Sequence, residues 1–223
     1  MSTDASVWTL VRPGPPPPGW PRAAALLLAV SAVLVGLTLI AGGAWHGNPG
    51  RYFGERKFGT YLSFVMLISA ATLSVLIAQR LGQSPSRRFW LVAAGLFAWV
   101  ACDDLFVFHE RADQLVHAVL GWNPNDALTD GGDDLIVAVY GIFAAWQAYR
   151  HREHLLQLRW MVLTMGVAFA CFCGMIVYDV MHWSKAVEDT FKVAAGTLIV
   201  AALLAAYWDP ALARRPPATS APG

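Results

Sequence analysis

Carboxylate and imidazole side chains gather in one short stretch, ACDDLFVFHERADQLV, at the end of a long apolar run. Asp103 and Asp104 lie roughly 8 Å before the end of that run, at about 1.5 Å of helix rise per residue. His109 and Glu110 follow at its end. Carboxylates and imidazoles about one helical turn apart bind divalent metals or transfer protons. The stretch therefore predicts a site for metal-assisted or acid–base chemistry.

The sequence leaves open whether the same helix continues through HERADQLVH. At about 100° per residue, Asp103 and Glu110 would then share a face, and Asp113 and His117 would follow Glu110 at i+3 and i+7.

Polar residues of the same kind begin or end three other apolar runs. Asp134 opens one run, Asp179 and His182 close the next, and Glu188 and Lys192 open the last. A carboxylate in the hydrocarbon region costs about 2.5 to 3.5 kcal/mol, so these side chains should face the protein interior and find partners there. Lys192 is expected to pair with a nearby acid, either Asp104 or Asp134.

These residues suggest metal-assisted hydrolysis of a lipid or an amide. The expected ligands of a divalent metal such as zinc are Asp104, His109, Asp134, Asp179 and His182. Glu110 is the expected general base for a metal-bound water. Asp103, Glu188 and Lys192 are the further candidate catalytic groups.

Three other functions fit the same residues. A proton- or ion-coupled transporter would use Asp104, Glu188 and Lys192 as a relay. A haem protein would use His46, His109 or His182 as an axial ligand. In a structural or partner-binding subunit, the polar cluster would only lock helix packing. Because acids outnumber Lys192 locally, we expect Asp104 to serve a site rather than an ion pair.

Other polar residues suggest no further site. His151 and His154 lie among arginines and are predicted to be solvated. The acidic stretch DALTDGGDD lacks the ligand spacing of an EF-hand. The three cysteines lie inside apolar runs with no CxxC spacing, which predicts small apolar residues rather than a disulfide framework.

The elements that position these residues are long apolar helices. The chain is 57% hydrophobic and 14% charged, whereas soluble domains carry about 25% charged residues. Charges cluster between six apolar runs, each close to the roughly 20 residues that a helix needs to cross a bilayer. The sequence thus predicts an all-α integral membrane protein, a bundle of six transmembrane helices with the bilayer as its partner. The predicted spans are Ala23–Trp45, Phe58–Gln79, Phe89–Phe108, Asp133–Tyr149, Arg159–Asp179 and Asp189–Trp208.

The arginines predict the orientation of this bundle. They concentrate in the N-terminal tail, in the loops after the second and fourth runs, and in the C-terminal tail. Positive residues favour the cytoplasmic side, so both termini should be cytoplasmic and the acidic groups extracytoplasmic. Residues 1–22 and 209–223 are expected to be disordered cytoplasmic tails around a transmembrane domain of residues 23–208. The net charge of +1 argues against a nucleic-acid partner, and a small-molecule or lipid ligand is compatible with the polar site.

The stretch DDLFVFHE resembles a pattern in uncharacterised bacterial multi-pass membrane proteins, in which an acidic pair near a helix end is followed by His-Glu. Many of those proteins also open their last helix with an acidic pair followed by a glycine, as Glu188, Asp189 and Gly196 do here. This resemblance implies a bacterial cytoplasmic membrane location and no established activity. A looser similarity links the chain to the seven-helix superfamily of alkaline ceramidases and progestin-receptor-like proteins, whose metal site uses Asp and several His. The Ser-x3-His and His-x3-His motifs of that superfamily are missing from the corresponding helices.

Overall fold

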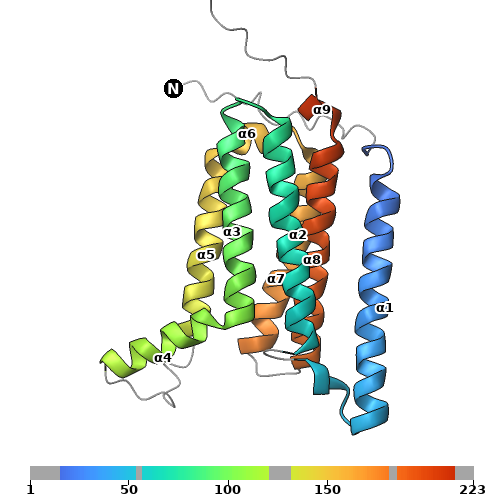
Figure 1. Ribbon diagram of the computed structural model, residues 1–223, viewed down its shortest axis with the longest axis vertical. Coiled ribbons are helices and arrows are strands. Elements are labelled where there is room, and N and C mark those ends of the chain that lie inside the picture. The colour runs from blue at the N-terminus through green and yellow to red at the C-terminus, as the bar shows by residue number, and fades with distance from the viewer. Residues whose placement is uncertain (1–15, 54–56, 121–131, 181–184, 214–223) are drawn as a thin grey trace, which may run out of the picture.

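The computed structural model describes residues 16–53, 57–120, 132–180 and 185–213, and these residues form helices joined by short connections (Figure 1). The helices are α1 (Trp20–His46), the 3-10 turn η2 (Pro49–Tyr52), α2 (Phe58–Arg80), α3 (Ser86–Phe106), α4 (Phe108–Leu120), α5 (Gly132–Arg150), α6 (Arg152–Leu155), α7 (Arg159–Val180), α8 (Lys185–Trp208) and α9 (Pro210–Ala213). The predicted tails lie mostly outside these ranges, although Trp20 already begins α1 and α9 forms within the predicted C-terminal tail.

Five of the described helices are long and apolar enough to cross a membrane: α1, α2, α3, α7 and α8. Many of their large apolar side chains point outward, among them Leu26, Ile40 and Phe169, each at least 65% exposed. An exposed apolar surface of this extent is typical of a protein that faces lipid. The prediction of an all-α membrane protein is therefore confirmed at this level. The remaining predicted span is the 19-residue helix α5, which runs beside α3 (Figure 1).

Helix α8 forms the centre of the bundle and packs against α1, α2 and α7. Its buried face consists mostly of small residues, including Ala195, Ala201 and Ala205. Small side chains let neighbouring helix backbones approach closely, which is the usual packing mode in membranes. Buried hydroxyls add a polar link, because Ser31 Oγ of α1 lies 2.9 Å from Thr197 Oγ1 of α8. The polar residues at the start of α8 are thus held on the most buried helix.

The structure ends α3 before His117, a point that the sequence leaves open. Val107 has a left-handed backbone conformation with φ 54°, which ends α3 at Phe106 and lets α4 begin at Phe108. A β-branched residue in this region is unfavourable by roughly 1–3 kcal/mol and needs support from its surroundings. Helix α4 leaves the bundle at a steep angle (Figure 1). Asp103 and Glu110 consequently lie on different helices.

Helix α4 is amphipathic and has the pattern of a helix that lies in a membrane interface. Its last turns expose Leu115, Val119 and Leu120, whereas His117 is buried. Because such a helix places its apolar face among lipid acyl chains and its polar face toward water, its angle to the bundle axis is consistent with that location. The break at Val107 therefore turns the chain away from the direction of α3 (Figure 1).

The two ends of the bundle differ in charge. The end where α3 meets α4 and where α8 begins carries the acids, and we call it the acidic end. The opposite end holds α6, the α2–α3 connection and the end of α8 (Figure 1). We call it the arginine-rich end, after Arg80, Arg87, Arg88, Arg150 and Arg152.

The prediction that His154 is solvated is wrong. His154 is only 7% exposed, and Trp90 of α3 donates its indole N–H to His154 Nε2 over 3.1 Å. Trp90 itself is 1% exposed. The bond needs α3 and the short helix α6 to be side by side, a proximity that the local run of arginines does not predict.

Candidate functional site

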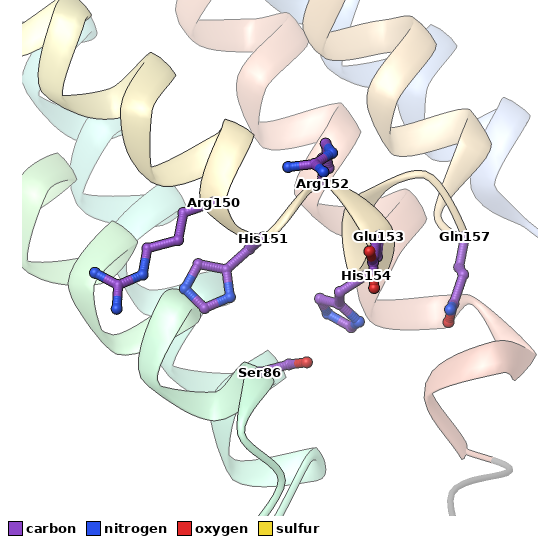
Figure 2. A pocket seen from close by; sticks show the side chains of 7 residues that line it. All are labelled: Ser86, Arg150, His151, Arg152, Glu153, His154 and Gln157. Carbon is purple, nitrogen blue, oxygen red and sulfur yellow. The ribbon is translucent and has the colours of Figure 1, made fainter. Parts of the chain in front are cut away.

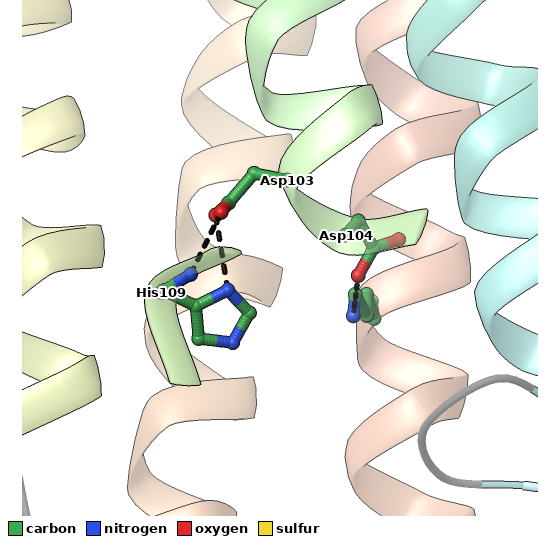
Figure 3. A network of polar contacts seen from close by, with 4 residues as sticks. Asp103, Asp104 and His109 are labelled. Atoms are coloured by element: carbon green, nitrogen blue, oxygen red, sulfur yellow. Dashed lines mark hydrogen bonds and ion pairs between the residues drawn. The ribbon is translucent and has the colours of Figure 1, made fainter. Parts of the chain in front are cut away.

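Asp103 holds His109 through two hydrogen bonds across the break between α3 and α4 (Figure 3). The backbone N–H of His109 donates to Asp103 Oδ1 at 2.9 Å, and His109 Nδ1 lies 3.0 Å from Asp103 Oδ2. Asp103 is 3% exposed, so its carboxylate is desolvated and needs these donors. The first bond also satisfies one of the N–H groups left free in the first turn of α4. One carboxylate thus fixes the helix break and the imidazole together.

Asp103 also determines which ring nitrogen of His109 can act. With Nδ1 donating to the carboxylate, a neutral imidazole carries its lone pair on Nε2. Carboxylates orient histidines in this way both in acid–base catalysis and next to bound metals. His109 Nε2 is therefore set up as a proton acceptor or as a metal ligand.

Asp104 forms an ion pair with Lys192 of α8. Lys192 Nζ donates to Asp104 Oδ1, and the two side chains are 24% and 7% exposed. The other carboxylate oxygen, Oδ2, is buried and has no hydrogen-bond partner among the described residues. The sequence suggested Asp104 or Asp134 as the partner of Lys192, and the structure brings Lys192 to Asp104.

The two acids serve two separate interactions. Successive residues of a helix point about 100° apart, so Asp103 and Asp104 face different neighbours. In Figure 3 the Asp103 carboxylate points to His109, and the Asp104 carboxylate points away from it toward its own partner. The neighbouring acids therefore form a carboxylate–imidazole pair and a carboxylate–ammonium pair instead of one shared cluster.

The expected metal ligands are only partly placed. Two of the expected ligands, Asp104 and His109, are described by the structure. They do not form one group, because Asp104 pairs with Lys192 and His109 with Asp103. Among the described residues, no three His, Cys, Asp or Glu side chains lie close enough to hold a metal ion. Residues that fall outside the described part of the structure are His182 and the side chains of Glu110, Asp134 and Asp179.

The remaining sequence candidates lie at the same end. Glu188 is partly buried in the first turn of α8. His46 ends α1, where its Nε2 lies 3.1 Å from the Tyr52 hydroxyl. This contact gives His46 a local partner at the surface.

The predicted site did not include Asp189, which the structure buries to 5% exposure one turn before Lys192. Gly59 at the start of α2 makes room for it, because a Cβ atom there would lie 2.7 Å from Asp189 Oδ2. Thr60, the next residue of α2, is 2% exposed. A glycine and a threonine at the start of an apolar run were the available signal, but they gain meaning only once α2 and α8 are known to be neighbours.

The fold and the polar pairs define the class of the protein: it is an all-helical, multi-pass membrane protein with buried ionisable residues at one end of its bundle. Residues 22–207 match a family described as a domain of unknown function (DUF8692), and the chain belongs to that family. No curated protein and no solved structure matches the chain.

Proposed function

We propose that the protein is a membrane hydrolase that cleaves a lipid or an amide at the acidic end of its bundle. The observation that carries this proposal is the Asp103–His109 pair, in which one buried carboxylate binds both the backbone and the ring of His109. A histidine whose ring orientation is fixed supplies a base in the right geometry. The start of the amphipathic helix α4, close to the level of lipid headgroups, suits a substrate that arrives from the bilayer.

In the proposed reaction, His109 Nε2 accepts a proton from water while the water oxygen attacks the carbonyl carbon of an ester or amide. The same ring then returns the proton to the leaving alcohol or amine, so that one water molecule is consumed for each bond broken. Asp103 stabilises the imidazolium that forms between these steps. Lys192 and Asp104 lie on another side of α3 and link it to α8.

In an alternative form of this proposal, His109 Nε2 would bind a divalent metal such as zinc instead of accepting a proton from water. The carboxylate–histidine pair is the arrangement that commonly supports a metal-bound imidazole. His182, Asp134 and Asp179 would complete the ligand set, and a bound metal would supply an activated water near neutral pH. Glu110 would then be the base for that water.

The hydrolase is tested with full-length protein reconstituted in lipid nanodiscs. We expect it to release fatty acid from a phospholipid mixture or from ceramide, measured by mass spectrometry of the products. Metal analysis of the same preparation, with and without prior dialysis against EDTA, decides whether His109 acts as a general base or as a metal ligand. Zinc that copurifies, and activity lost on dialysis and restored by zinc, would support the metal. If none of these lipids yields fatty acid, the proposed hydrolase activity is contradicted.

We also propose the finer topology of six spans, with α5 as the fourth, and with the arginine-rich end and both termini in the cytoplasm. The arginines at one end and the acids at the other support this orientation. The acidic pairs would then open to the extracytoplasmic side of a bacterial cytoplasmic membrane.

A reporter enzyme that is active only outside the cytoplasm tests the topology. We expect alkaline phosphatase to be active when fused after residue 125, between α4 and α5, and inactive when fused after residue 223. Equal expression of both fusions, checked by immunoblot, is the control. The reverse pattern of activities would place the polar pairs on the cytoplasmic side and contradict the orientation.

A proton-coupled carrier is the second candidate, and the Asp104–Lys192 pair favours it. This pair joins two helices, α3 and α8, that are long and apolar enough to cross a membrane, close to the acidic end of the bundle. Ionisable residues at such a depth often mark a proton or ion pathway. A carrier would require the pair to separate during transport, whereas the hydrolase requires it to remain closed.

A further inference from the structure

A pocket of about 360 Å³ opens at the arginine-rich end, far from the acidic pairs (Figure 2). It lies between the start of α3 and the segment that joins α5 to α7. Figure 2 shows Ser86 of α3 across from His151 and His154. Arg150, Arg152, Glu153 and Gln157 complete the lining. The volume is within the range of small-ligand sites, about 300–1,000 Å³.

The guanidinium groups of the two arginines stack on aromatic rings. Arg150 Cζ lies 5.6 Å from the centre of the Trp146 ring, and Arg152 Cζ lies 4.6 Å from that of Tyr149. Stacking of this kind orients a guanidinium through its face. Arg152 Nη1 also donates to the Tyr149 carbonyl oxygen at 3.4 Å, which leaves its other N–H groups to donate to an anion. Among the described residues, neither arginine forms an ion pair with a carboxylate. Glu153 is the single acid of the lining, so the fixed charges sum to an excess of one positive charge.

Aromatic residues of α3 hold the two histidines of the lining. His154 Nε2 accepts the Trp90 N–H, so the neutral ring carries its proton on Nδ1. His151 packs on Phe89, with the ring centres 5.2 Å apart. Ser86 lies in the first turn of the 21-residue helix α3, where the helix dipole favours negative charge. The lining therefore carries two guanidiniums, two imidazoles, a hydroxyl and a helix N-terminus, and Figure 2 shows Arg150 and Arg152 extending to different sides of His151.

We propose that this pocket binds a phosphate group, and that the phosphate belongs to the headgroup of an anionic phospholipid. Guanidinium groups match the geometry of phosphate oxygens and donate two parallel hydrogen bonds to them. The pocket lies at an end of the bundle where lipid headgroups surround the helices, and basic pockets between helices are common binding sites for anionic headgroups. The proposal does not depend on hydrolysis at the acidic end.

The test is calorimetric titration of full-length protein in a non-ionic detergent. The probes are dihexanoyl phosphatidylglycerol, dihexanoyl phosphatidylcholine and inorganic phosphate. We expect the phosphatidylglycerol to bind, and the double variant Arg150→Gln/Arg152→Gln to bind it about thirty-fold more weakly, at about fivefold for each arginine. The matched control is Arg87→Gln/Arg88→Gln, which removes two exposed arginines of the same end that do not line the pocket.

Each outcome bears on the proposal. Preference for phosphatidylglycerol over the other two probes, lost only in Arg150→Gln/Arg152→Gln, supports a headgroup site. Binding of inorganic phosphate as tight as that of the lipid, with the same loss, would support the phosphate site and overturn its assignment to a lipid. Equal weakening in both double variants would show general surface attraction and overturn the pocket. No binding of either anionic probe would also overturn it. Circular dichroism of both variants checks that they remain folded.

Discussion

Replacement of His109 by alanine is expected to lower the rate of lipid hydrolysis by about 10²- to 10⁴-fold, which is the usual contribution of a positioned general base. Asp103→Asn should cause a comparable loss for a different reason. The introduced carboxamide still accepts the His109 backbone N–H through its oxygen, but its NH₂ group donates to Nδ1. The ring proton then moves to Nε2, which can no longer accept a proton or bind a metal.

The measurement is fatty acid release in nanodiscs, with thermal unfolding of each variant followed in parallel. His46→Ala is the matched control, because His46 lies at the same end of the bundle but contacts Tyr52 and not Asp103. It should retain nearly full activity. If His109→Ala retains activity within about threefold of the wild type, or if His46→Ala loses as much, the role of the Asp103–His109 pair in hydrolysis is wrong.

Removal of one partner from the Asp104–Lys192 pair should destabilise the protein by about 3 kcal/mol, the lower end of the range for buried pairs, because Lys192 is 24% exposed. Lys192→Met leaves the Asp104 carboxylate buried without this counter-charge, and Asp104→Asn removes the carboxylate that Lys192 contacts. The double variant should recover most of the loss, since neither charge remains. The contact therefore favours an ion pair, whereas the sequence led us to expect that Asp104 serves a site instead.

Thermal unfolding of the two single variants and the double variant in detergent gives the coupling free energy as a double-mutant cycle. Lys57→Met, which removes an exposed lysine before α2, is the control for loss of a positive charge at the same end. Additive effects, with no recovery in the double variant, would contradict a structural pair. An Asp104→Asn protein as stable as the wild type would instead favour a carrier, in which Asp104 exchanges its proton.

The sequence by itself determined the helical membrane architecture. Length and hydropathy suffice for this, because a backbone in hydrocarbon must satisfy its own hydrogen bonds and a helix does so within one segment. Predicted and observed helices agree within a few residues, as for Phe58–Gln79 against Phe58–Arg80. The sequence also located the acids near the ends of runs, since the cost of burying a charge marks each of them as unusual.

Side-chain partners depended on contacts between distant segments. Asp104 and Lys192 are 88 positions apart, and both Asp104 and Asp134 were compatible with the sequence. His154 looked solvated among its arginines until α6 came to lie against Trp90. In each case the local sequence is the same whether the partner is water or a side chain, and only the packing of α3 against its neighbours decides which it is.

The break at Val107 is the clearest decision of the tertiary structure. Nothing in the residue type predicts it, because valine disfavours the left-handed conformation and the flanking phenylalanines continue the apolar run. The break becomes favourable through contacts that form only in the folded chain: Val107 is buried to 2% exposure, and Asp103 accepts the His109 N–H. Helical periodicity predicted that Asp103 would act with Glu110, whereas the turn of the chain at Val107 brings His109 back to it.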